Sequence, residues 1–222
     1  AGTAVTTGDN TTAVGYEACK ATKDSYENTG IGYRALKSAD NAGGQYTFFG
    51  SWNTAVGAYC LDSLTTGRAN TAVGKNALGS ATTIYNSTAI GNEAMANNTA
   101  NAHECVAVGN DAGKGLSGSK NVCIGHSSAF VQTLTGDNNI LIGALSQASS
   151  TSVSNECTIG GISTYGTAIT KFRIPGINFV LKGNTSTPTE GHVLTVDSNG
   201  EAGFEAAAGG GLDSDSQQNT LG

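Results

Sequence analysis

Residues 70–78 read Asn70-Thr71-Ala72-Val73-Gly74-Lys75-Asn76-Ala77-Leu78, and variants of this unit recur along most of the chain. Its glycine marks each copy, and successive marker glycines lie 17, 25, 17, 17, 18, 16, 18 and 17 residues apart. The marker glycines are Gly15, Gly32, Gly57, Gly74, Gly91, Gly109, Gly125, Gly143 and Gly160. A fixed period of this kind predicts a solenoid, in which each unit forms one coil and stacked coils bury each other's apolar faces.

One step, from Gly32 to Gly57, is longer than the others. It contains Thr47-Phe48-Phe49-Gly50, which follows the pattern of the repeat core. We therefore expect an additional unit here, with a shortened return to Gly57.

Each unit alternates along a short stretch, which predicts a β-strand. The residue before the marker glycine is Val or Ile, and the residue two places earlier is most often Thr, Val or Ile. We expect these two residues to face inward, with the Ala and Leu that follow the glycine filling the coil. Helical repeats are disfavoured, because β-branched residues with Gly and Asn between them oppose helix formation.

The small residue between the two β-branched positions is then expected to face outward. It forms the column Ala13, Ala55, Ala72, Ala89 and Ala107. A single narrow roll would expose this apolar column, so we expect it to form the interface of a parallel homotrimer.

The repeat stops near residue 162, and a different β pattern follows. Apolar stretches at 167–174 and 177–182 flank Pro175-Gly176, and a second pair flanks Asp197-Ser198-Asn199-Gly200, which are turn signals. The predicted organisation is a β-roll over 1–162, a small antiparallel β module over 163–206, and a Gly-rich linker with the start of a further repeat over 207–222.

The composition is poor in charged residues, at 13%, and in aromatic residues, at 6%, and it includes 32 glycines, so it favours a turn-rich backbone. The net charge is −6 and the Lys and Arg residues are scattered, so we expect no nucleic-acid partner. No apolar run is long enough for membrane insertion.

No motif indicates catalysis, a metal or a cofactor. The five cysteines lack the spacing of a zinc site and are interpreted as free packing residues, with Cys123 in an outward slot and Cys157 in an inward one. Coil stacking can align Glu17, Arg34 and Asp111 with Glu93 along one edge, which we interpret as a solvated charged edge and not as a hydrolytic carboxylate pair. We therefore expect a protein that is not an enzyme.

An ice-binding solenoid is a weaker alternative. Such solenoids need a flat ladder of paired threonines. Here the repeated threonine of the first units is single and gives way to Val106, Val122 and Ile140.

The unit Asn86-Ser87-Thr88-Ala89-Ile90-Gly91 resembles the Asn-Ser-x-Ala-Ile-Gly repeats of trimeric autotransporter adhesin heads. The longer Asn-Thr-Ala-Val-Gly version resembles repeats of tail-fibre and structural proteins of phages and marine viruses. The resemblance covers about residues 1–162 and implies a left-handed parallel β-roll with three chains side by side.

These observations predict a structural segment of an extracellular fibre, such as a phage tail fibre on the virion, that supports host attachment. The expected partners are two further copies of the chain, other fibre or virion proteins, and a host-surface receptor. The alternative is a trimeric adhesin head on a bacterial cell surface that binds a host glycan or protein directly. Both ends of the chain resemble partial repeats, so we expect a piece of a longer fibre protein.

Overall fold

The computed structural model describes residues 10–22, 25–39, 49–98, 102–130 and 133–161, together with the backbone of four later strands. The chain divides into two compact units, Ala1–Gly166 and Thr167–Gly222. The expected boundary at 162/163 and the expected linker at 207–222 lie outside the described residues. None of the described residues forms a helix.

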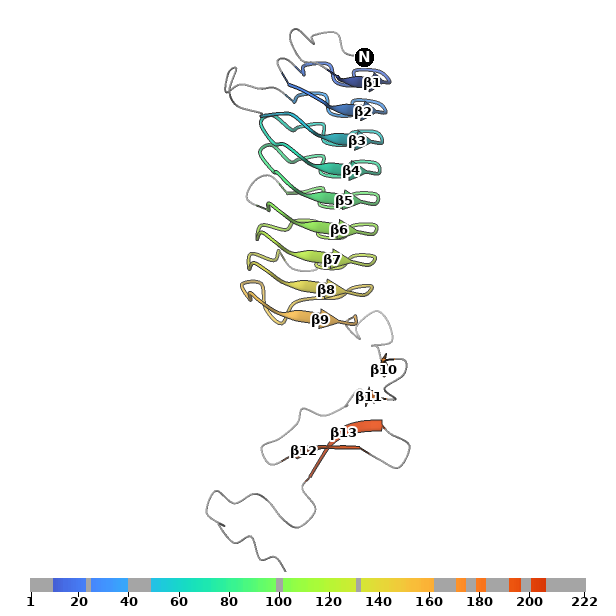
Figure 1. Cartoon of the computed structure of the whole chain (residues 1–222), viewed down its shortest axis with the longest axis vertical. Helices are drawn as coiled ribbons and strands as arrows, with labels where there is room; N and C mark the ends of the chain where they lie inside the picture. The colour runs from blue at the N-terminus through green and yellow to red at the C-terminus, as the bar shows by residue number, and fades with distance from the viewer. Residues whose placement is uncertain are drawn as a thin grey trace, which may run out of the picture. The chain divides into compact units, whose positions relative to one another are not determined.

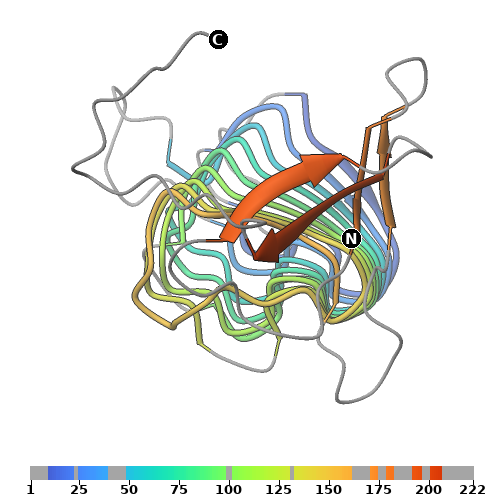
Figure 2. The same ribbon diagram turned by 90° about the horizontal axis from the view of Figure 1, so that it is seen from below.

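The first unit is a β-solenoid whose repeats each contribute one three-residue strand (Figure 1). The strands are β1 (Thr12–Val14), β2 (Thr29–Ile31), β3 (Thr54–Val56), β4 (Thr71–Val73), β5 (Thr88–Ile90), β6 (Val106–Val108), β7 (Val122–Ile124), β8 (Ile140–Ile142) and β9 (Cys157–Ile159). They form one parallel sheet in chain order, which confirms the predicted solenoid with a coil of about seventeen residues. Seen along the stack in Figure 2, the coils lie over one another.

The register of this sheet repeats from coil to coil. Thr54 pairs with Thr71, Ala55 with Ala72 and Val56 with Val73, and the other strand pairs follow the same rule. Each of the three strand positions therefore forms a column along the stack, and residues of one column share similar surroundings.

The expected additional unit does not form a strand in this sheet. β2 pairs directly with β3, so the longer step between Gly32 and Gly57 leaves the ladder unchanged. Gly50 accepts a hydrogen bond from Asn28 Nδ2, as Gly67 does from Asn53 Nδ2, so Gly50 matches Gly67 and is not a marker glycine. Thr47 and Phe48 lie outside the described residues.

The inward and outward positions of the strands are the reverse of those expected. Ala55, Ala72, Ala89 and Ala107 are fully buried inside the solenoid, and Ala13 at its first strand is partly buried against the same core. These alanines therefore do not form an outward interface column. The cause is space: a Cβ added at Gly30, in the same column, would lie 2.5 Å from the sulfur of Cys19. Over β1 to β6 the coil therefore holds only Ala or Gly in this column, whereas Leu141 is accommodated further along, in β8.

A second part of the core comes from the residues that follow the marker glycines, as predicted, and a third from return-segment residues such as Leu64, Ile84 and Leu134, which were not predicted. The third and fourth residues after the glycine are buried in most coils, for example Ala77 and Leu78, or Ala94 and Met95. The glycine itself allows the tight corner. Gly57 has φ +135°, and a Cβ there would lie 2.5 Å from the carbonyl oxygen of Gly74.

A buried polar ladder runs along the corner that precedes the strands. The side-chain oxygen of Asn28 accepts from the backbone N–H of Asn53 at 2.9 Å, and Asn53 does the same for Asn70 at 3.1 Å. Asn70 continues the ladder to Ser87, and Asn121 and Asn139 repeat it further along. These side chains are nearly fully buried, so each coil is bonded to the next through polar groups withdrawn from water.

The second unit contains a four-stranded sheet with the order β10-β11-β13-β12. The strands are β10 (Lys171–Ile174), β11 (Phe179–Lys182), β12 (His192–Val196) and β13 (Glu201–Ala206). β10 pairs antiparallel with β11, and β12 antiparallel with β13, whereas β11 pairs parallel with β13. The sheet is therefore mixed, where the sequence predicted an antiparallel module. The two turn signals at 175–176 and 197–200 lie outside the described residues.

Candidate functional site

The outward face of the nine-stranded sheet carries an unbroken column of β-branched apolar residues. Each is the residue before the marker glycine: Val14, Ile31, Val56, Val73, Ile90, Val108, Ile124, Ile142 and Ile159. Six of them are exposed large hydrophobics, from 36% at Ile142 to 56% at Val14, and the three remaining valines are half-buried. A continuous exposed apolar column in a folded chain indicates an interaction surface.

A second outward column runs beside the first, two residues earlier in each strand. Threonine occupies it in β1 to β5, as Thr12, Thr29, Thr54, Thr71 and Thr88, and the residues that follow are Val106, Val122, Ile140 and Cys157. Within the described part of the chain, no hydroxyl of these five threonines makes a hydrogen bond. The face is thus half polar over its first five coils and wholly apolar from β6 to β8.

Sequence reasoning missed this face because period-two alternation does not say which side of a strand is inside. A signal was present in the size of the residues. The middle position is Ala or Gly in the first six strands, and a narrow coil already filled by Ala and Leu has room only for the smaller set.

Aromatic and charged side chains gather on the corner that follows the strands. Tyr16 and Tyr33 stack with ring centroids 5.4 Å apart, and Tyr33 meets Tyr59 edge to face at 5.1 Å. The guanidinium of Arg34 lies 5.5 Å from the centre of the Tyr59 ring and 3.2 Å from the Asp62 carboxylate. Tyr16 remains 66% exposed and Tyr33 43%, so this corner is a ladder of contacting side chains that also faces solvent.

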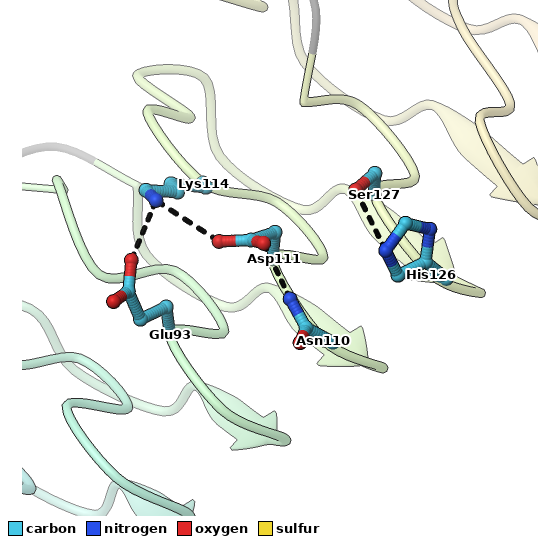
Figure 3. A network of polar contacts seen from close by, with 6 residues as sticks. All are labelled: Glu93, Asn110, Asp111, Lys114, His126 and Ser127. Carbon is cyan, nitrogen blue, oxygen red and sulfur yellow. Dashed lines mark hydrogen bonds and ion pairs between the residues drawn. The ribbon is translucent and has the colours of Figure 1, made fainter.

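The same corner carries an ion-pair network further along the stack (Figure 3). Lys114 Nζ lies 2.5 Å from the Glu93 carboxylate and 2.9 Å from that of Asp111, which brings together side chains from adjacent coils. The hydrogen bond to Glu93, followed by that to Asp111, raises the pKa of Lys114. The stacking expected from the sequence is therefore present for Glu93 and Asp111, and for Glu17, whose carboxylate lies 3.7 Å from Arg34 Nε.

Nearby in Figure 3, His126 Nε2 lies 3.5 Å from Ser127 Oγ, and Asn110 Nδ2 donates to Asp111. Each of these contacts joins neighbouring residues in the chain. The carboxylates of Glu93 and Asp111 both pair with the Lys114 ammonium group, so this network is an ion-pair cluster and not a pair of free catalytic carboxylates.

The cysteines also follow the inverted facing. Cys123, expected in an outward slot, is fully buried, and Cys157, expected in an inward one, is exposed. Burial raises the pKa of the Cys123 thiol to about 12 and that of Cys105 to about 11. All five cysteines are free, and only Cys157 is accessible as a thiol on the surface.

Among the residues that the structure describes, no group of three or more His, Cys, Asp or Glu side chains could hold a metal ion. No helix in this part of the chain is long and apolar enough to cross a membrane. Neither a family model nor a curated protein nor a solved structure matches the chain.

Proposed function

We propose that this chain is a structural segment of an extracellular fibre, as in a virus tail fibre, and that it assembles as a parallel homotrimer through the outward face of its sheet. The unbroken outward column of Val and Ile carries the proposal. In a single chain this column stays in contact with water along all nine strands. Burying apolar surface of this kind yields about 25 cal/mol per Å², so a partner that covers it gains stability.

The period of the column supports a second and third copy of the chain as the partner. Strands stack about 4.8 Å apart, so the outward Val and Ile recur at that interval over the whole array. A partner that covers every coil must have the same period, and another copy has it. The number three rests on the resemblance to trimeric adhesin heads.

A parallel arrangement also suits a fibre. Rotation about an axis along the stack keeps the same end of every copy pointing the same way, so each assembled segment can extend a longer rod. In this proposal the coils supply length and stiffness, and attachment to other virion proteins or to a host receptor lies outside the array. No catalytic step is part of the function.

Light scattering of the chain in native buffer tests the proposal. The expected mass is three times 22.2 kDa. A mass of one chain at micromolar concentration would contradict it, because the apolar face would then be stable in water.

One observation favours a second candidate, an ice-binding solenoid. The threonines of β1 to β5 face outward with free hydroxyls, whereas the sequence placed them inside. They form a column in register at the strand spacing, beside the Val and Ile column. A monomeric chain that reshapes growing ice crystals would favour this candidate over the fibre.

A further inference from the structure

The composition of the outward face changes along the stack. Assembly through the Val and Ile column alone does not require this change. Over β1 to β5 one of its two columns is threonine; over β6 to β8 both are Val or Ile. We propose that the change from Thr88 to Val106 fixes the axial register of the copies in the fibre. The inference rests on the homotrimer proposed above.

A repeat solenoid needs such a register signal. The column of Val and Ile before the marker glycines is nearly uniform over nine strands, so sliding one copy by one coil leaves most of its contacts unchanged. Weakly specified register allows slippage and alternative pairings. Natural assemblies commonly break such degeneracy with polar residues at a few interface positions.

The threonine column can supply this specificity. Rotation without translation sets each coil against the same coil of the other copies, so threonine levels meet threonine levels and apolar levels meet apolar levels. The free hydroxyls then have hydroxyls or shared water as partners. A sliding copy would bring threonines against Val106, Val122 and Ile140, where a buried hydroxyl has no partner. The number of mismatched levels grows with each coil of displacement.

The chain carries its own reporter of register in Cys157. This residue occupies the threonine column in β9, and it is the exposed one of the five free cysteines. In-register packing places the Cys157 residues of all copies at one height. Each coil of displacement moves them about 4.8 Å apart along the axis. A short bifunctional thiol reagent is therefore expected to cross-link copies that are in register more efficiently than displaced copies, and a native trimer that does not cross-link at Cys157 would count against the proposed register.

The test compares the native chain with a five-valine variant, Thr12→Val, Thr29→Val, Thr54→Val, Thr71→Val, Thr88→Val, which removes the contrast between the two parts of the face. We expect the variant to remain assembled by light scattering, because it gains apolar contacts, while the cross-linked fraction at Cys157 falls at least threefold. The matched control is Thr83→Val, Thr133→Val, Thr151→Val, three exposed threonines outside the sheet, which should cross-link as the native chain does. Cys157→Ser should remove every cross-link.

A second variant removes the same contrast by adding threonines in place of the apolar residues. Val106→Thr, Val122→Thr, Ile140→Thr extends the threonine column over β6 to β8, which should weaken assembly at least tenfold and lower cross-linking of the remaining trimer. A trimeric five-valine variant that cross-links like the native chain would overturn the register proposal and leave the fibre proposal standing. A native chain that is monomeric would overturn the fibre proposal itself.

Discussion

The two faces of the nine-stranded sheet carry equally regular columns but obey different constraints. Inside, the middle residue of each strand is Ala or Gly from β1 to β6, because the neighbouring coil leaves no room for more, as the 2.5 Å approach at Gly30 illustrates. Outside, the nine strands carry Thr, Val, Ile and, in β9, Cys without disturbing the pairing. The inner face therefore determines whether the chain folds, and the outer face is free to determine what it binds.

The inner ladder of asparagines offers the largest effect. In Asn70→Ala, the backbone N–H of Ser87 and the carbonyl of Ile84 lose hydrogen bonds of 3.1 and 2.7 Å inside the protein. Two buried unsatisfied groups predict a loss of about 3–4 kcal/mol in the free energy of unfolding, measured by denaturant titration. Asn92→Ala, at an exposed position on the opposite corner, is the control and should change stability by less than about 0.5 kcal/mol. Equal losses in the two variants would refute a special role for the ladder.

The space inside the strand is the next constraint to test. Ala72→Leu places a large side chain in a fully buried position, so we expect a loss of about 2–3 kcal/mol from overpacking. Another coil of the chain indicates a compensating substitution for this overpacking. Leu141 occupies this column in β8, where the preceding coil has Ala129 at the position that is Leu61 in the coil before Ala72.

The double variant Ala72→Leu, Leu61→Ala should therefore recover part of the stability lost in Ala72→Leu, as judged by the same denaturant titration. A double variant less stable than the sum of its single changes would show that the two positions do not share space.

The smallest effect concerns pH. The His103 ring stacks on Tyr85 with centroids 3.9 Å apart, and burial lowers the pKa of His103 while the Glu104 carboxylate opposes that shift. The folded chain thus prefers the neutral ring. The contribution of the buried, neutral His103 ring to the free energy of unfolding is complete above the unfolded pKa of about 6.5. It decreases as the pH falls through and below that value.

Thermal unfolding at pH 7.5 and pH 5.0 measures this contribution, and His103→Phe keeps the stack without the titration. We expect the melting temperature to fall less between pH 7.5 and pH 5.0 in His103→Phe than in the native chain. The same loss in both would assign the pH dependence to other groups.

Sequence reasoning predicted the solenoid, its period and the burial of the Ala and Leu after each marker glycine, because these follow from the spacing of the repeat. It placed Ala72 outside and Val73 inside, because alternation is symmetric and hydrophobicity favours burying valine. The space inside the coil decides which of the two residues faces inward. That space depends on how closely adjacent coils approach, which the sequence of a single repeat does not reveal. The longer step before Gly57 misled for a similar reason, since the direct pairing of β2 with β3 cannot be deduced from composition.

Neighbouring residues on β5 test the central claim most directly: Ala89 is fully buried and Ile90 is 41% exposed. Circular dichroism and light scattering should be measured together for Ala89→Glu and Ile90→Glu. We predict that Ala89→Glu loses the β-solenoid signal, because it buries an unpaired charge, whereas Ile90→Glu keeps the native signal and has the mass of a single chain. An unfolded Ile90→Glu, or a folded Ile90→Glu that still assembles like the native chain, would contradict the assignment of the outer face to assembly.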